Sequence, residues 1–152
     1  MNYEIRPVEF GDLDQLVNLC AEHATYEGCD YSKRGKKEVL QKLLLSKHST
    51  LKCLVVASGN ALIGYATFVK QISTWDATNY VYMDCLYLKD DYRGFGLGKE
   101  LLVSIKTYAY NNGCCEIQWQ TPIDNNRAIK FYKRQGAEMK TKSRFFLNVD
   151  FP

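Results

Sequence analysis

The stretch with the most chemistry to offer is Met83–Lys99, which reads MDCLYLKDDYRGFGLGK. An apolar, aromatic-rich run leads through the charged turn Lys89–Asp91 into Arg-Gly-Phe-Gly-Leu-Gly, and a helical pattern follows. This order of strand, turn, glycine-rich loop and helix directs a row of backbone N–H groups at one point. The first N–H groups of a helix lack internal partners and carry partial positive charge, and glycine lets a ligand come close to the backbone. The stretch therefore predicts an anion-binding site.

The glycine spacing excludes two better-known phosphate loops. A dinucleotide fingerprint would need glycine where Lys99 stands, and a P-loop would need serine or threonine where Glu100 stands. Glycines between a strand and a helix also serve as a tight turn with close packing. The loop alone leaves both interpretations open.

Asp84 is a candidate functional residue, because it interrupts the apolar strand before the loop. Strand interiors disfavour aspartate, and a carboxylate among apolar neighbours needs a partner. A cationic amine is a suitable partner, which makes Asp84 a candidate base. The alternative is a structural aspartate that binds a nearby lysine or backbone N–H.

The hydrophobic and turn patterns predict the elements that position these residues. Strands are expected at 3–7, 51–57, 61–70, 80–88, 116–120 and 143–149, with a turn or frayed strand end at 72–77. Helices are expected from 12 to about 28, around 39–44, at 98–111 and at 127–135. This order predicts an α+β fold with a mixed sheet, in one domain spanning 1–152.

Composition limits the class of protein. With 46% hydrophobic and 24% charged residues and a net charge of +3, the chain resembles a soluble globular protein without a nucleic-acid partner. It shows no membrane span or signal peptide. The six cysteines form no C-x-x-C pair and only two histidines are present, so no metal site is expected. We expect reduced cysteines and a cytoplasmic location.

A second motif gives the loop a context. Residues 125–137 place Asn125 and Asn126 at a helix start, with Tyr132 two turns on and Gly136 at the end. Together with the glycine loop, and with Ile5-Arg6-Pro7 followed by Asp12, this segment resembles the GCN5-related N-acetyltransferase (GNAT) superfamily. Shorter matches, above all Asp91–Gly96, look like its diamine branch, which acts on spermidine, spermine or thialysine. The resemblance covers the whole chain and implies a central, mostly antiparallel mixed sheet flanked by helices.

The resemblance implies an acetyl-CoA site. The backbone of the central strand would hold the pantetheine, the loop would hold the pyrophosphate, and the 125–132 segment would flank the pantetheine. The cofactor-binding residues implied are Leu86, Tyr87, Leu88, Arg93, Gly94, Phe95, Gly96, Leu97, Gly98, Lys99, Asn125, Ala128 and Tyr132. An alternative for Lys99 is a solvated lysine in the first helical turn.

The same resemblance implies an enzyme that transfers acetyl to a primary amine by direct transfer in a ternary complex. Tyr132 would be the general acid for the leaving thiolate, since a phenol with a pKa of about 10 is protonated at neutral pH. Its alternative is a core tyrosine. Asp84 would be the base and would face the amine. The diamine branch carries glutamate there, so the reach of Asp84 is one methylene shorter.

The amine pocket implied by the resemblance consists of Tyr26, Glu27, Trp75, Asp84 and Gln118. A carboxylate would bind a remote ammonium and aromatic rings would add cation–π contact. Arg144 stands where the polyamine enzymes have an acidic residue. It therefore favours a substrate with a carboxylate, such as an amino acid or thialysine-like compound, or one without a second amine.

Other functions remain as alternatives. The chain could acetylate a peptide, a protein or an aminoglycoside, or it could bind acyl-CoA without turnover. No base accompanies Cys85, so no acetyl-enzyme is expected. The family is often dimeric, and a homodimer is expected here.

Overall fold

The computed structural model describes residues 2–150, which fall into two compact units, 2–120 and 121–150, each described by itself below. Unit 1 contains the strands β1 (Glu4–Pro7), β2 (Leu51–Ser58), β3 (Ala61–Ser73), β4 (Thr78–Leu88) and β5 (Cys114–Gln118). Its α-helices are α1 (Leu13–Tyr26), α2 (Lys36–Leu45) and α3 (Leu97–Asn111), with short 3₁₀ turns at Phe10–Asp12 and Asp90–Tyr92. Unit 2 contains α4 (Asn126–Arg134).

The five strands form one mixed sheet in the order β1-β2-β3-β4-β5. The first four strands pair antiparallel, and β5 pairs parallel to β4. A parallel pair needs a crossover connection, and α3 supplies it between β4 and β5. The mixed, mostly antiparallel sheet flanked by helices is therefore confirmed.

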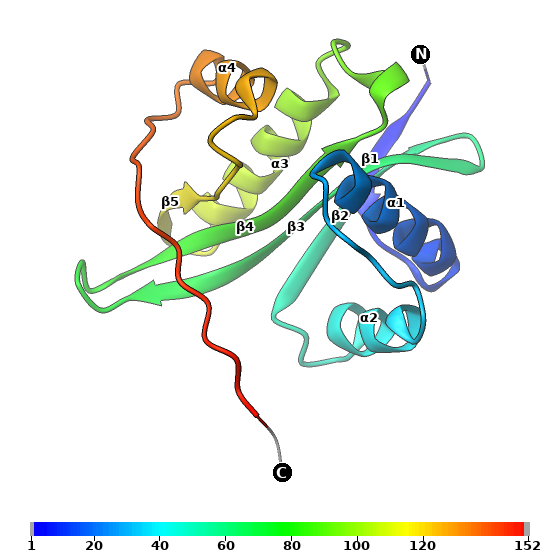
Figure 1. The fold of residues 1–152 in the computed structure, drawn as a ribbon, viewed down its shortest axis with the longest axis horizontal. Coiled ribbons are helices and arrows are strands. Elements are labelled where there is room, and N and C mark those ends of the chain that lie inside the picture. Colours follow the sequence, from blue (N-terminus) through cyan, green and yellow to red (C-terminus); the bar gives the residue numbers. More distant parts are fainter. Residues whose placement is uncertain (1, 151–152) are drawn as a thin grey trace. The chain divides into compact units, whose positions relative to one another are not determined.

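Helices lie on both faces of this sheet (Figure 1). On one face, Leu16 and Leu19 of α1 pack with Tyr65 and with Val55, and Leu40 of α2 packs against the same cluster. On the other face, the ring of Phe68 from β3 meets Tyr108 of α3 edge-on, with centroids 5.0 Å apart. Burial of these apolar stripes on both sides provides the core.

An ion pair joins the first strand to the first helix. The Arg6 guanidinium donates to both carboxylate oxygens of Asp12, at 2.6 and 2.9 Å, and the backbone N–H of Glu9 donates to Asp12 at 2.8 Å. Asp12 is buried, so both charges need this pairing. The arginine–aspartate spacing of the N-terminal motif thus has a structural reason.

Several predicted boundaries need correction. The β3–β4 hairpin is longer than expected, because β3 runs to Ser73 instead of 70 and β4 begins at Thr78 instead of 80. The predicted turn or strand end at 72–77 is confirmed, with strand at 72–73 and a turn at 74–77. Because β2 pairs with β3 only as far as Val69, the hairpin end projects past β2 (Figure 1). β5 begins at Cys114, two residues earlier than predicted, and ends at Gln118.

The predicted strand at 143–149 is wrong. The segment has no regular secondary structure, and most of its apolar side chains are exposed. Alternation indicates which residues suit a sheet face, but a strand also needs a partner strand. Within the segment, the Arg144 guanidinium lies 4.8 Å from the Phe146 ring centroid.

Three further features bear on the class of protein. Across residues 2–150, no helix is long and apolar enough to cross a membrane. Within the same range, no group of three or more His, Cys, Asp or Glu side chains is arranged to hold a metal ion. All six cysteines are free thiols.

Candidate active site

A β-bulge in the middle of β4 displaces Asp84 from the regular strand pattern. Cys85 lies opposite Thr67 of β3, whereas Met83 lies opposite Phe68, so Asp84 is the extra residue. Met83 is buried and Asp84 is exposed. A bulge redirects side chains locally, and here the extra residue carries an exposed carboxylate next to the buried Met83.

One edge of β4 is open beyond this bulge. β5 pairs with β4 only at Asn79, Val81 and Tyr82, and β4 then continues to Leu88. Among the residues that the structure describes, no strand pairs with Met83–Leu88 on that side. An unpaired strand edge offers N–H and C=O groups to an extended ligand. The open edge includes Leu86, Tyr87 and Leu88, the residues predicted to hold the pantetheine.

The glycine loop that follows leaves its backbone accessible. Gly94 and Gly96 have φ of +90° and +87°, a conformation that side-chain-bearing residues rarely adopt. A Cβ at either glycine would have no neighbour within 4 Å, so both positions face open space. Gly96 is the N-cap of α3, and no side chain caps this helix start. The exposed amides of an uncapped helix start fit an anionic phosphate group.

The side chains around the loop differ in their surroundings. Phe95 is exposed, Leu97 and Gly98 are buried beneath the loop, and Lys99 is exposed in the first turn of α3. Their predicted contacts with the cofactor remain predictions.

Arg93 supports the end of β4. Its Nε donates to the Leu88 carbonyl oxygen at 2.7 Å, and its Nη1 lies 3.1 Å from the Asp90 carboxylate. Its guanidinium also covers the rings of Tyr26 and Tyr87, at 4.3 and 5.4 Å from their centroids. These contacts hold the loop to the strand, and a contact of Arg93 with phosphate remains a prediction.

The end of α1 lies over the open half of β4. Tyr26 is the last residue of α1, and Glu27 is its C-cap. The Tyr26 ring lies 6.3 Å from the Tyr87 ring. Two residues of the predicted amine pocket are therefore close to the strand that carries Asp84.

The structure does not bring Trp75 to this place. Trp75 lies in the turn of the β3–β4 hairpin and is 96% exposed. Thr78, which begins β4, is nine residues from Tyr87, or about 30 Å at the usual rise per strand residue. Gln118 is nearer: it ends β5, opposite Tyr82, and donates to Glu116 at 2.6 Å.

Sequence reasoning missed His23. The ring stacks on Tyr87 with centroids 5.0 Å apart and an interplanar angle of 21°. Its Nδ1 lies 2.9 Å from the Tyr65 hydroxyl and its Nε2 lies 3.2 Å from Glu27 Oε1. Its spacing could have indicated that His23 faces the sheet, because it follows Leu16 and Cys20 by seven and three residues on the apolar stripe of α1.

Burial shifts the protonation of this cluster. Desolvation lowers the pKa of His23, although the nearby carboxylate of Glu27 acts in the opposite direction. Desolvation raises the pKa of Tyr65 and raises that of the Cys85 thiol to about 12. At neutral pH, the histidine is therefore neutral and the thiol and phenol stay protonated. A protonated thiol is a poor nucleophile, which supports the expectation that no acetyl-enzyme forms on Cys85.

Unit 2 carries the second sequence motif. The Asn125 side chain caps α4 by accepting from the backbone N–H of Ala128 at 3.2 Å. Gly136, with φ of +85°, follows the helix end. Tyr132 is half-buried on α4, with its ring centroid 5.1 Å from that of Phe131. The predicted capping is confirmed, and the predicted acid role of Tyr132 remains a prediction.

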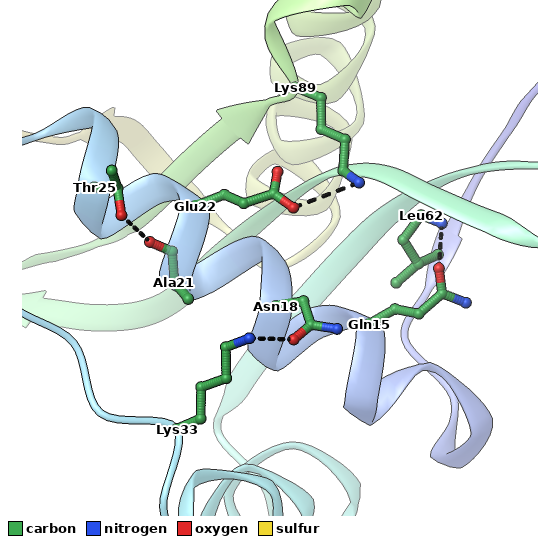
Figure 2. A pocket seen from close by; sticks show the side chains of 8 residues that line it. All are labelled: Gln15, Asn18, Ala21, Glu22, Thr25, Lys33, Leu62 and Lys89. Atoms are coloured by element: carbon green, nitrogen blue, oxygen red, sulfur yellow. Dashed lines mark hydrogen bonds and ion pairs between the residues drawn. The ribbon is translucent and has the colours of Figure 1, made fainter.

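A polar pocket of about 430 Å³ lies along α1 (Figure 2). Its polar groups pair with one another: Lys33 with Asn18 at 2.7 Å, and Glu22 with Lys89 at 3.5 Å. Gln15 accepts from the backbone N–H of Leu62. No predicted site residue lines this pocket.

Comparison of the sequence with known proteins identifies the family of this chain. Residues 14–137 match the model of the acetyltransferase (GNAT) family. The chain belongs to that family. This acetyltransferase is 27% identical over 147 residues to the thialysine N-epsilon-acetyltransferase of Bos taurus, covering 91% of this chain and 86% of that protein. It is 23% identical over 142 residues to the human spermidine/spermine N(1)-acetyltransferase-like protein 1, covering 89% of this chain and 20% of that protein.

The fold of this acetyltransferase also recurs among solved structures. An aminoglycoside N-acetyltransferase in complex with CoA aligns with a TM-score of 0.80 at 17% identity, over 97% of this chain and 95% of that chain. The GNAT family uses acetyl-CoA. The open edge of β4 and the uncapped start of α3 are suited to such an extended, phosphate-bearing molecule.

Proposed function

We propose that this enzyme transfers acetyl from acetyl-CoA to a primary amine of a small molecule, by direct transfer in a ternary complex. The observation that carries the proposal is the open half of β4, with the bulged Asp84 at one end and the uncapped glycine loop at the other. The similarity to thialysine and polyamine acetyltransferases favours a diamine, a polyamine or a lysine-like compound.

Each part of the β4 edge and the glycine loop has a proposed task, and Tyr132 of unit 2 is proposed for another. Backbone groups of Leu86–Leu88 hold the pantetheine, and the N–H groups of Gly94–Lys99 hold the pyrophosphate. The bound thioester supplies an activated acetyl group. Asp84 accepts the proton of the amine, directly or through water, and Tyr132 donates a proton to the departing sulfur.

The acceptor amine is proposed to bind beside Tyr26 and Glu27, which lie at the end of α1. A carboxylate and an aromatic face both stabilise an ammonium group. Arg144, a cation in the 143–149 segment, supports an acceptor that carries a carboxylate. A lysine-like substrate meets both conditions.

A turnover screen tests the proposal. Purified protein and acetyl-CoA are mixed with diamines, lysine and thialysine, aminoglycosides and N-terminal peptides, and thiol release and product mass are measured. We expect the highest kcat/KM with lysine-like compounds or diamines. Tight CoA binding without turnover of any amine would instead indicate an acyl-CoA-binding module.

We also propose a cytoplasmic homodimer with no nucleic-acid or membrane partner. Six free thiols support a reducing compartment. The exposed Ile72 and Trp75 at the hairpin end support self-association, since aromatic residues are enriched at interfaces. Sedimentation should give twice the chain mass, and Trp75→Ala should weaken the association. A monomer at about 10 μM, well above the Kd of stable dimers, would contradict this.

A further inference from the structure

His23 connects the core of unit 1 to the proposed amine site. Only 15% of its side chain is exposed, and it lies between Tyr65 on the buried side and Glu27 on the surface side. A ring stacked on Tyr87 cannot turn freely, because the Tyr65 ring also meets it edge-on at 5.9 Å. The position of the imidazole is therefore fixed from three directions.

The hydrogen bonds also fix the tautomer. An ionised Glu27 carboxylate only accepts, so the Nε2 of His23 must carry the proton at that contact. Nδ1 then accepts from the Tyr65 hydroxyl, which keeps its proton because burial raises the pKa of this phenol. The result is a chain of hydrogen bonds in which Tyr65 donates to a neutral His23 and His23 donates to the Glu27 carboxylate.

A proton added to His23 would disturb this chain. The new N–H at Nδ1 would point at the Tyr65 oxygen, and the phenol proton would need another partner. The positive ring would then be the counterion of Glu27. The charged and titratable groups that face His23 come from α1, β3, β4 and the glycine loop, and they are Glu27, Tyr65, Asp84, Tyr87 and Arg93.

We propose that His23 is a positioning residue that directs the Glu27 carboxylate toward the cationic acceptor while it is neutral, and that its protonation makes it compete with the acceptor for Glu27. The inference rests on the proposed function, since it assigns Glu27 to the acceptor. Binding of the ammonium and protonation of His23 are mutually unfavourable, and thermodynamic linkage makes the two effects equal.

Kinetics as a function of pH provide the first test. Between about pH 8 and 5.5, the range in which histidine titrates, the wild-type KM for the amine should rise as the pH falls. His23→Ala should raise the KM at neutral pH by about tenfold, as expected for a lost hydrogen bond to a charged group. His23→Gln, whose amide N–H can still reach Glu27, should restore most of that loss but should remove the rise at acid pH.

Ring titration by NMR provides a test that does not need turnover. The chain has two histidines, so in the His48→Gln variant the only histidine ring signals come from His23. His48 is exposed, so its replacement should not disturb the fold. Glu27→Gln should lower the His23 pKa, because the carboxylate favours the charged ring. Tyr65→Phe should raise it, because Nδ1 loses its donor. Saturating amine should lower it.

The outcomes separate the two proposals. If the wild type acetylates no amine, the proposed function fails, and the NMR comparison of the Glu27 and Tyr65 variants still decides whether the three side chains act as a unit. If an amine is acetylated but His23→Gln keeps the acid rise in KM, the inference is wrong. An unchanged His23 pKa in Glu27→Gln also overturns it.

Discussion

At the scale of single residues, three polar side chains carry the roles proposed for this enzyme: Asp84 as base, Tyr132 as acid and His23 as a positioning residue. Asp84 is exposed and is the extra residue at the bulge of β4. His23 is held by Tyr65, Glu27 and Tyr87. Asp84 could be suggested from sequence, since an aspartate in an apolar strand is unusual. His23 was missed because a histidine on an apolar stripe is ordinarily a packed core residue.

Replacing Asp84 by alanine should reduce turnover and alter its pH dependence. Loss of a general base typically costs about 10²–10⁴ in rate, and the rising limb of the kcat/KM profile should move or flatten. Steady-state kinetics between about pH 6 and 10, which spans the ordinary pKa values of histidine and amines, measures both effects. Asp14→Asn, on the exposed side of α1, is the control. A profile in Asp84→Ala with the same limb would remove Asp84 as the base.

Replacing Tyr132 by phenylalanine should lower kcat by about 10²-fold and leave CoA affinity within about threefold, since only the proton donor is lost. Calorimetry with CoA and turnover with the best amine measure the two quantities. Tyr110→Phe serves as the control, because Tyr110 is an exposed tyrosine on α3. Unchanged kcat in Tyr132→Phe would mean that another group protonates the thiolate.

At the scale of elements, the segment formed by β4, the glycine loop and α3 determines where an anion can bind. The open edge of β4 results from the early end of β5, and the loop conformation results from glycines at positive φ. Arg93 holds the loop to the Leu88 carbonyl group. The order of strand, glycine loop and helix could be predicted from the sequence. The open edge could not, because it depends on where β5, which follows α3, stops pairing with β4.

Gly96→Ala should weaken CoA binding beyond its effect on stability. The φ of +87° makes alanine unfavourable by about 1–2 kcal/mol, and the added methyl group would occupy the open space above the helix start. Gly113→Ala is a matched control, because Gly113 follows the other end of α3 with φ of +65° and equally open space. Thermal unfolding and CoA calorimetry should show similar losses of stability, but weaker CoA binding only in Gly96→Ala. Equal CoA affinities would exclude the loop as the anion site.

At the scale of the whole molecule, unit 1 is one sheet covered on both faces, and its first strand is tied to α1 by a buried ion pair. Arg6 donation lowers the pKa of Asp12 below that of an unfolded chain. The ion pair therefore stabilises the fold above pH ~3.9, the ordinary value for aspartate, and this contribution is lost as the pH falls through the lowered folded-state pKa.

Asp12→Asn should reduce the free energy of unfolding by about 2–3 kcal/mol at neutral pH, because it leaves the Arg6 guanidinium half-buried without its counterion. The difference from wild type should shrink below pH ~4, where the wild-type carboxyl takes up its proton. Urea unfolding at several pH values measures it. Asp14→Asn, an exposed partner of Lys37, should cost under about 0.5 kcal/mol. If the difference in the free energy of unfolding between wild type and Asp12→Asn does not change with pH, the ion pair is not the cause of that difference.

The sequence by itself determined the local features of this protein. Apolar periodicity predicted α1, α3 and most strands, and glycines and Asn125 predicted the loop and the cap of α4, because these depend on residues close in the chain. Tertiary structure alone decided the bulge at Asp84, the open edge of β4, the placement of His23 and the distance of Trp75 from α1. It also decided that 143–149 is not a strand. Strand register and the presence of a partner strand depend on residues far apart in sequence, and no local pattern specifies them.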